Sequence, residues 1–307
     1  MKKNIERLIK AIKDPFWLLG VFLRWISPLI KDDKLFVKIE YFLAMKRVLH
    51  LDNPITFNEK IQWLKIYDTN PLHEKMVDKG EVKNIVGKII GEEYIIPTLG
   101  IWDTFDEIDF DQLPKQFVLK CTHDSGGIFI CKDKNQMDIG KARKTIMKNY
   151  NKKYFYEHRE NPYKNLVPRI IAESYLEDES GWQLKDYKIF CFNGKPKFIE
   201  VDYDRYKFHK LNVYDLDWNY IDFYMTSPND PQVHITKPKM LDLMLRLAET
   251  LAKDETFVRV DFYSIYDKVY FGELTYHPGA GMVDFHPKEY DWKLGEMLKL
   301  PHENTAC

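Results

Sequence analysis

The sequence has little cysteine, which argues against a fold held together by disulfides. Its four cysteines are widely spaced, and none forms a Cys-x-x-Cys pair. Disulfide scaffolds carry many more cysteines, and structural zinc sites use closely paired ones. We therefore expect reduced thiols and a cytoplasmic protein, with Cys121 and Cys131 as small, buried apolar residues.

Long hydrophobic runs and an excess of one charge are also missing. The longest apolar stretch, residues 16–30, contains Arg24 and is shorter than the roughly 20 residues that a membrane-spanning helix needs. The 46 lysines and arginines nearly balance the 47 acidic residues, so the net charge is only −1. A protein that coats nucleic acid through its phosphates would be strongly basic. The sequence thus predicts no transmembrane helix and no nucleic-acid partner.

Several common catalytic motifs do not occur either. The chain contains no GxxxxGK[ST], GxGxxG, HExxH or GxSxG sequence. This argues against a Walker-type nucleotide site, a dinucleotide-binding fold, a zinc peptidase and a serine hydrolase. Two Asp-x-Asp pairs, Asp202 with Asp204 and Asp215 with Asp217, leave open a glycosyltransferase that binds a metal and a nucleotide sugar, although such pairs are common in turns.

What the chain does contain is ample material for a mixed α+β core. Hydrophobic residues make up 45% and aromatic residues 15% of the sequence, which favours a sheet-rich architecture. Apolar spacing predicts helices over residues 58–67, with Thr56 or Asn58 as N-cap, and over 73–89, 138–154 and 237–253. Alternating residues around turn signals predict hairpins over 117–132, 186–204 and 257–277. In the second hairpin, Asn193-Gly194 favours a type I′ turn.

The N-terminal segment combines basic and apolar aromatic residues. Residues 1–50 carry 11 lysines and arginines against 5 acidic residues, together with Phe16, Trp17, Phe22 and Trp25. One interpretation is a helical extension that packs its apolar side on the protein body. The other is that residues 1–35 bind an anionic membrane surface, because interfacial helices use this combination.

The hairpin over 257–277 indicates a candidate site. Side chains alternate along a strand, and a turn centred on Asp267 places Asp261 opposite Glu273 and Arg259 opposite Thr275. Opposed carboxylates destabilise a sheet unless a cation compensates, and Mg²⁺ suits oxygen ligands. A neighbouring arginine can clamp phosphate. The alternative is that both acids face solvent and pair with lysine or arginine.

A glycine-rich loop indicates a second candidate. Lys120 ends an apolar strand shortly before Ser125-Gly126-Gly127. Amides in such a loop can approach an anion closely, so a phosphate grip is one interpretation and an ordinary turn is the other.

Taken in order, these segments resemble the ATP-grasp enzymes, and among them the TupA-like group named after a teichuronopeptide biosynthesis protein. The resemblance covers Asn53 to Leu300. It rests on the blocks NPITFNEKIQWLK, MVDKGEVK, YIIPTLGIWD, LPKQFVLKCTHDSGG, IIAESYL, DYKIFCFNGKPKFIEVD, FVRVDFY and FGELTYHPGAG. It implies an α+β fold whose two subdomains hold ATP. The expected divisions are a helical extension over 1–52, a helical segment over 53–112, a lid over 113–172 and a C-terminal subdomain with the magnesium site over 173–307.

The resemblance also implies nucleotide-binding residues. Lys120 is similar to the lid lysine that contacts the phosphates, and Lys79 or Lys83 to an earlier lysine that reaches them. The loop of Ser125, Gly126 and Gly127 would close over the phosphates. The hinge from Glu173 through Tyr175 to Leu176 would bind adenine, and Glu177 or Glu179 the ribose.

Catalytic and metal-binding roles follow in the same way. Asp261 and Glu273 match the family's magnesium carboxylates, and Arg259 matches the arginine that stabilises the transferring phosphoryl group. Lys188 is expected to face the same cleft. Thr275 stands where many relatives have asparagine, so this second metal contact departs from the family pattern.

The implied activity is that of an ADP-forming carboxylate–amine ligase using ATP and Mg²⁺. The expected substrates are a uronic acid of a surface polysaccharide, or a nucleotide-linked or lipid-linked sugar precursor, and an amino acid or another amine. Because ATP-grasp sites also phosphorylate alcohols, a kinase remains an alternative. A glycosyltransferase and a non-catalytic nucleotide-binding scaffold are the other two.

Overall fold

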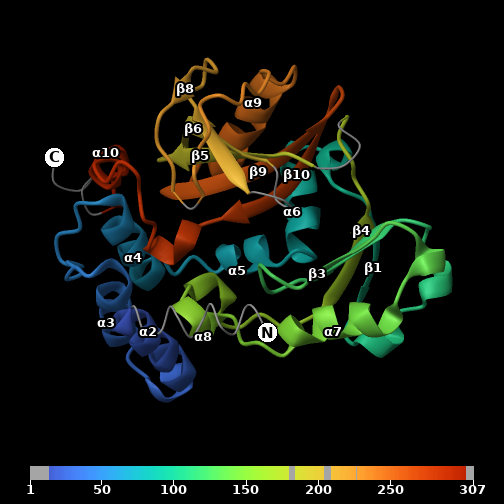
Figure 1. The fold of residues 1–307 in the computed structure, drawn as a ribbon, viewed down its shortest axis with the longest axis horizontal. Helices are drawn as coiled ribbons and strands as arrows, with labels where there is room; N and C mark the ends of the chain where they lie inside the picture. The colour runs from blue at the N-terminus through green and yellow to red at the C-terminus, as the bar shows by residue number, and fades with distance from the viewer. Residues whose placement is uncertain (1–13, 180–183, 204–208, 226, 302–307) are drawn as a thin grey trace.

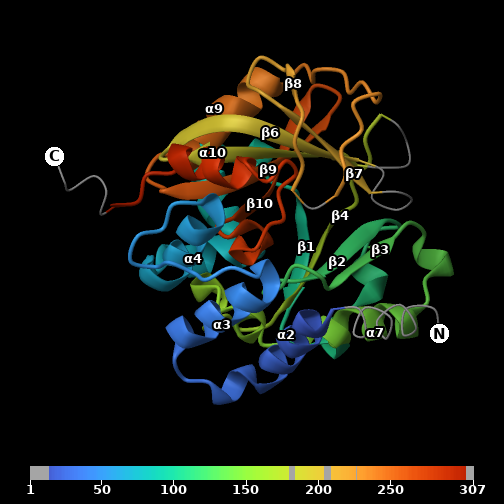
Figure 2. The same ribbon diagram turned by 60° about the vertical axis from the view of Figure 1, so that its left-hand side comes forward.

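Two antiparallel sheets form the body of the protein in the computed structural model, which describes residues 14–179, 184–203, 209–225 and 227–301 (Figure 1). One sheet has four strands and the other has six. The N-terminal helices lie together at one end of the molecule, as Figures 1 and 2 show from two directions.

The N-terminal extension has a hydrophobic core of its own. Its helices are α2 (Pro15–Ile26), which Asp14 caps, and α3 (Asp33–Met45), which Asp32 caps. Apolar residues of these helices and of the segment after them form one buried cluster: Leu23, Phe36, Val37, Tyr41, Leu49 and Leu51. Part of the extension therefore packs on the body, as one of the two interpretations predicted.

Helix α4 (Phe57–Tyr67) begins as the sequence predicts. Thr56 accepts a hydrogen bond from the Glu59 amide, and Glu59 accepts one from the Thr56 amide, which completes a capping box. Such reciprocal bonds satisfy amides that the first helical turn leaves unpaired.

The single helix predicted over 73–89 is wrong, because the structure has two helices there. These are α5 (Leu72–Val77) and α6 (Glu81–Ile90). The Asp78 carboxylate accepts hydrogen bonds from the amides of Gly80 and Glu81, and the Lys79 amide donates to the Thr122 carbonyl. An aspartate that bonds to nearby amides competes with helical hydrogen bonding, so the chain turns at this point.

The four-stranded sheet has the order β1-β4-β2-β3, and all its pairs are antiparallel. Its strands are β1 (Thr98–Trp102), β2 (Phe117–Cys121), β3 (Ile128–Cys131) and β4 (Ile170–Ser174). The predicted hairpin over 117–132 is confirmed as β2 and β3. Helix α7 (Ile139–Tyr150) starts after Asp138 as predicted, ends four residues early, and packs on this sheet; α8 (Phe155–His158) follows it.

The six-stranded sheet has the order β10-β9-β5-β6-β7-β8. Its strands are β5 (Asp186–Phe192), β6 (Lys195–Tyr203), β7 (Lys210–Tyr214), β8 (Tyr220–Ile221), β9 (Phe257–Ile265) and β10 (Lys268–Thr275). Asn193 and Gly194 join β5 to β6 with φ of 47° and 79°, as the predicted type I′ turn requires. Helix α9 (Leu241–Ala252) is the core of the predicted helix over 237–253.

The two faces of the six-stranded sheet differ because side chains alternate along each strand. One face is apolar and packs against α9. The other has an apolar half, whose phenylalanines contact α4 and α10 (Tyr290–Met297), and a polar half that carries buried charges. The polar half supplies most of the candidate site.

The predicted register of the last hairpin is confirmed, although the turn is displaced. Asp261 pairs with Glu273 and Arg259 with Thr275. Near the turn, Lys268 pairs with Ile265, so the hairpin is centred between residues 266 and 267. A register shift at Gly272 restores the expected pairs, and a Cβ at Gly272 would lie only 3.0 Å from the Asp261 carbonyl oxygen.

None of the helices described here combines the length and the apolar character needed to cross a bilayer. Cys121, Cys131 and Cys191 are buried free thiols, and Cys307 lies outside the described residues.

Candidate active site

A cavity of about 400 Å³ brings together residues from both sheets and from the segment after α7. From the side of the four-stranded sheet come Lys79, Asp124 and Ser125. The six-stranded sheet contributes Arg259 of β9 and Glu273 and Thr275 of β10. Four predicted site residues and Thr275 therefore line one cavity.

A buried ion triad is centred on β4 of the four-stranded sheet. Glu173 in β4 places its carboxylate 2.6 Å from the Lys83 Nζ and 2.5 Å from the Lys120 Nζ. Burial alone would raise the pKa of Glu173, but Lys120 and Lys83 lower it to about 2. The sequence predicted a hinge position for Glu173 and missed this pairing, because neither lysine is near it in the chain.

The helix break distinguishes the two lysines that the sequence could not separate. Lys79 lies in the break between α5 and α6, lines the cavity and donates a hydrogen bond to the Asp124 carbonyl. Lys83 is one turn further on, points to Glu173 and donates to the Ile96 carbonyl at 2.7 Å. Burial lowers the pKa of Lys83, although Glu173 opposes this effect.

Arg259 compensates the two opposed carboxylates of the last hairpin. Its Nε and Nη2 donate to the two oxygens of Asp261 at 2.7 and 2.6 Å, and Nη2 lies 3.3 Å from Glu273 Oε1. Burial raises the pKa of Asp261 to about 6, although Arg259 opposes the shift. Burial would also raise the pKa of Glu273, but Lys79 and Arg259 lower it overall. The acids thus pair with arginine, yet Asp261 is buried rather than facing solvent.

Lys188 lies beside this group on β5, opposite Asp261 on one side and Glu200 on the other. Its ammonium pairs with Asp202 and lies 3.6 Å from Asp186 and 3.9 Å from Glu200. Burial raises the pKa of Glu200 to about 7. The sequence analysis missed Asp186 and Glu200, although their even spacing from Lys188 and Asp202 could have placed all four on one face.

The aspartates of the two Asp-x-Asp pairs that the structure describes form ion pairs or turn hydrogen bonds. Asp202 pairs with Lys188 and with His209 at 3.3 Å, while Asp204 lies outside the described residues. Asp215 accepts hydrogen bonds from the amides of Asp217 and Asn219, which makes it a turn residue. The geometry therefore gives no support to a metal site at Asp215.

The predicted adenine-binding and ribose-binding residues do not all lie at one cavity. Tyr175, Leu176 and Glu177 follow β4, and the Tyr175 hydroxyl donates to Glu177 at 2.9 Å. Glu179 lines a different cavity of about 650 Å³ with Tyr187.

The loop between β2 and β3 is tightly built. The Gly127 amide donates to Asp124 Oδ1 at 3.2 Å, and a Cβ at Gly127 would lie 2.6 Å from Cys121 Sγ. Ser125 lines the cavity and contacts the Tyr154 hydroxyl at 3.1 Å. Gly126 lies between them at the tip of the loop.

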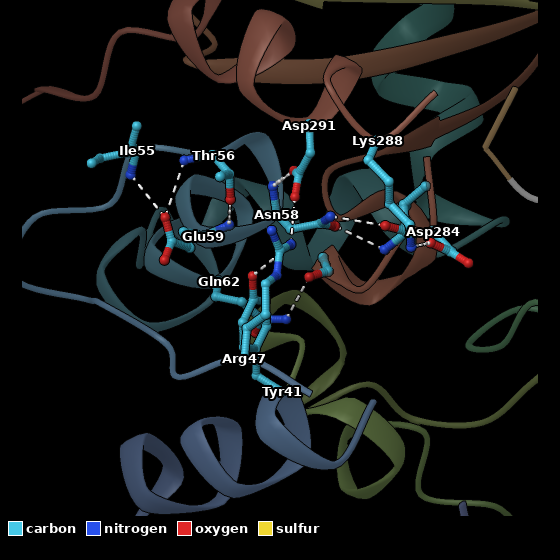
Figure 3. A network of polar contacts seen from close by, with 12 residues as sticks. Tyr41, Arg47, Ile55, Thr56, Asn58, Glu59, Gln62, Asp284, Lys288 and Asp291 are labelled. Atoms are coloured by element: carbon cyan, nitrogen blue, oxygen red, sulfur yellow. Dashed lines mark hydrogen bonds and ion pairs between the residues drawn. The ribbon is translucent and has the colours of Figure 1, made fainter. Parts of the chain in front are cut away.

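Helix α4 lies in a network of polar contacts (Figure 3) and fixes the loop after β10, whose residues Gly279 and Ala280 line the cavity. Asn58 exchanges two hydrogen bonds with the Val283 backbone, and Gln62 donates to the carbonyls of Ala280 and Gly281. These anchors hold Gly279, Ala280 and Gly281 with φ of 55°, 53° and 68°. The left-handed region is costly for residues other than glycine, so side-chain hydrogen bonds must hold this loop in place.

The residues present fit ATP with Mg²⁺, the cofactors that the sequence resemblance implies. Lysine and arginine side chains on both walls can neutralise phosphate. Among the described residues, no cluster of three or more His, Cys, Asp or Glu side chains could hold a metal ion by itself. Mg²⁺ bound with a nucleotide needs only one or two carboxylates, because phosphate and water supply its other ligands. Asp261 and Glu273 are such a pair.

Comparison with known proteins agrees with this assignment. The model of the family described as TupA-like ATPgrasp matches residues 59–299. A D-alanine–D-alanine ligase from Bacillus anthracis, solved with ATP, has 16% identity over 66% of this chain and 53% of that chain, with a TM-score of 0.38. The chain thus spans about half the length of that ligase.

Two other solved structures show a similar degree of likeness. A second structure of the Bacillus anthracis ligase has 15% identity over 77% of this chain and 72% of that chain, with a TM-score of 0.45. An L-amino acid ligase from Bacillus licheniformis has 12% identity over 89% and 63%, with a TM-score of 0.47. Comparison with curated proteins found no match. Since the family match covers most of the chain, the protein is a member of the TupA-like ATP-grasp family, with the α+β ATP-grasp fold that its sequence predicts.

Proposed function

We propose that the protein is an ATP-dependent, ADP-forming carboxylate–amine ligase that uses Mg²⁺. The observation that carries this proposal is the single cavity with Lys79 on one wall and Arg259 on the other, beside the pair Asp261 and Glu273. Positioning and charge neutralisation do most of the work in phosphoryl transfer, so such a site needs cations and metal ligands rather than a nucleophilic side chain.

The reaction has two steps. A carboxylate oxygen of the substrate takes the γ-phosphoryl group, the bond between that phosphorus and ADP breaks, and an acyl phosphate forms. The amine nitrogen then bonds to the acyl carbon while the carbon–oxygen bond to phosphate breaks. The ammonium gives up two protons, one to the departing phosphate and one to solvent. Arg259 lies where it can stabilise charge on the transferring group.

The proposed acceptor is a uronic acid of a surface polysaccharide of capsule, teichuronic acid or O-antigen type, or its nucleotide-linked or lipid-linked precursor. The proposed amine is an amino acid. Family resemblance supports this pairing, and Lys188, Lys120 and the hinge residues complete the proposed ATP site as the sequence analysis assigned them.

A substrate-omission experiment tests the function. Purified protein with ATP and Mg²⁺ is assayed for ADP in the presence of methyl glucuronide, of a mixture of amino acids, or of both. A ligase forms ADP in proportion to amide when both are present. ADP accompanied by a phosphorylated sugar without amine would indicate a kinase instead, and turnover of a nucleotide sugar without ADP would indicate a glycosyltransferase.

We also propose that the N-terminal helices bring the enzyme to the cytoplasmic face of an anionic membrane, where a lipid-linked sugar would be met. Support comes from an exposed apolar stripe along one side of α2, where Trp25 is 77% exposed. Leu18, Phe22 and Leu29 continue this stripe at helical spacing. The basic residues that precede α2 in the sequence complement anionic lipid.

A further inference from the structure

Part of the cavity wall carries groups that the proposed phosphate contacts do not use. Here the cavity is lined by residues of the segment that follows α7, namely Tyr154, His158, Glu160 and Tyr163, and by His277 after β10. The same cavity is lined by Lys79, Arg259 and Glu273. The cavity therefore holds a further carboxylate, Glu160, besides the one beside Arg259.

Glu160 is a buried carboxylate without a lysine or arginine at ion-pair distance among the described residues. It is 7% exposed. The buried ammonium of Lys65 interacts electrostatically with Glu160 but donates its hydrogen bond to the Ala280 carbonyl at 3.1 Å. His277 Nδ1 lies 3.5 Å from Glu160 Oε2. Burying a charge without a counter-ion is costly, so this position suits a cationic guest.

His277 provides a second observation, because its Nδ1 lies 3.5 Å from Glu160 Oε2 without forming a hydrogen bond to it. Its side chain is buried, with the residue 6% exposed, and it lines the same cavity. Its Nδ1 has no hydrogen-bond partner. Buried polar atoms are nearly always satisfied, so an unpartnered nitrogen facing a cavity marks a place for a ligand.

The surrounding aromatic rings favour a cation as well. Tyr154 and Tyr163 lie with their ring centroids 4.7 Å apart, and both line the cavity next to Glu160. Aromatic faces attract ammonium groups. Glu160 would repel a carboxylate substrate, whereas Arg259 would attract one.

We propose that Glu160 binds the ammonium group of the amine substrate, a primary amine such as an amino acid, with His277 as a second polar contact. This inference rests on the proposed ligase function. It places both reactants in one cavity, with the acyl phosphate near Arg259 and the amine near Glu160. The amine could then reach the acyl carbon that it must attack.

The N-terminal extension fixes this part of the cavity wall. Arg159, next to Glu160, is fully buried and donates to the carbonyls of Ser27 and Ile30 at 2.7 and 2.9 Å. Its Nε lies 2.8 Å from Asp33. The proposed subsite is thus held from outside the residues that the family model matches, which gives this chain a means of setting its own amine preference.

Hydroxylamine separates binding of the amine from formation of the acyl phosphate. It traps acyl phosphates as hydroxamates and is uncharged at neutral pH. Its reaction therefore does not depend on a carboxylate that binds the ammonium group of an amine substrate. The test compares wild type, Glu160→Gln and the matched control Glu157→Gln, an acid of α8 that does not line the cavity. Each is assayed with ATP, Mg²⁺ and methyl glucuronide, plus either hydroxylamine or single amino acids and ethanolamine.

We expect Glu160→Gln to raise the KM for the amine by about 10-fold to 100-fold, as the loss of a charge-assisted contact implies. Hydroxamate formation by this variant should stay within about twofold of wild type, and Glu157→Gln should match wild type in both assays. Glu160→Asp, which keeps the charge, should recover part of the amine affinity.

Three results would overturn the proposal in distinguishable ways. An equal loss of hydroxamate and amide in a folded Glu160→Gln variant would assign Glu160 to acyl phosphate formation, and an unchanged amine KM would exclude it from the site. A wild-type enzyme that forms neither hydroxamate nor ADP would overturn the ligase function and the subsite with it.

Discussion

Glu173 shows how one residue can bind two elements that are distant in the chain. Its carboxylate joins Lys83 of α6 to Lys120 of β2, and all three groups are largely buried. A buried pair of this kind contributes less than its Coulomb energy suggests, because all its charges have lost their water. Removing one partner is far more costly, since it leaves the other charges unpaired.

Replacing Glu173 with glutamine should therefore destabilise the protein by about 3 to 5 kcal/mol, because it leaves two neighbouring lysines facing a neutral amide. Chemical denaturation of wild type and variant measures the difference, and Glu177→Gln serves as the control because Glu177 is not part of the triad. A loss below about 1 kcal/mol would contradict the buried triad.

The same variant gives a prediction for pH. The pKa of Glu173 falls from 4.5 to about 2 on folding, so its contribution is complete above pH 4.5 and is lost as the pH falls toward 2. We expect the stability gap between wild type and Glu173→Gln to narrow over that interval. A difference in unfolding free energy between wild type and variant that stays constant down to pH 2 would show that the Glu173 carboxylate is not held in its ionised form.

Asp261 faces Glu273 across the last hairpin, and the two acids share Arg259 as their partner. From the sequence alone, neutralising one of two facing acids should relieve repulsion. In the structure Arg259 donates two hydrogen bonds to Asp261, so the pair is already compensated.

We expect Asp261→Asn to abolish ADP formation and to lower stability by about 1.5 to 3 kcal/mol, since it weakens charge-assisted bonds from Arg259. Activity assays and thermal unfolding check both effects. Thr275→Ser, which keeps a hydroxyl beside the site, is the matched control and should retain both properties. An active Asp261→Asn enzyme would exclude the carboxylate from the magnesium site.

Among the secondary-structure elements, α4 influences the cavity through the loop that follows β10. Its polar side chains reach backbone groups of the loop that follows β10, and Asp291 of α10 accepts from the Asn58 amide at 2.9 Å and from Arg47 at 2.6 Å (Figure 3). The loop contains Ala280 in the left-handed region, so α4 holds a conformation that the loop would not adopt unaided.

Asn58→Ala should consequently destabilise the protein by about 2 to 4 kcal/mol, because the Val283 amide and carbonyl both lose a buried partner. Thermal unfolding measures this loss, and Asn151→Ala at the exposed end of α7 is the control. Because the same loop lines the cavity, the KM for the amine should rise as well. A variant with wild-type stability would show that α4 does not hold the loop.

How far sequence can predict an element depends on where its determinants lie. The hairpin register, the Thr56 cap and the Asn193-Gly194 turn follow from neighbouring residues, and the structure confirms them. The break at Asp78 depends partly on local hydrogen bonds to its carboxylate and partly on one from the Lys79 amide to the Thr122 carbonyl after β2, which no local pattern contains. The Glu173 triad was missed for the same reason, since its three members come together only when the sheet forms.

At the scale of the whole molecule, the N-terminal extension has two faces with different surroundings. Its inner face packs Phe36 and Tyr41 into a buried cluster and holds Arg159 in place. Its outer face leaves Trp25 and Leu29 exposed to 77% and 80%. Deleting the extension would remove the partners of Arg159 along with the outer face, so membrane binding has to be tested with point substitutions.

Full-length protein should sediment with vesicles that contain anionic lipid at low salt and should be released at high salt. Each basic residue near such a surface contributes about 1 kcal/mol, and apolar insertion adds to this. Trp25→Ser combined with Leu29→Ser should reduce sedimentation several-fold without changing the melting temperature, because both side chains are exposed. The control combines Val167→Ser with Met297→Ser, two exposed apolar residues outside the extension, and should sediment like wild type. If the wild-type protein stays in the supernatant at low salt, it does not bind anionic membranes. The exposed apolar stripe of α2 then has another partner, and a lipid-linked substrate must reach the cavity without membrane binding by the extension.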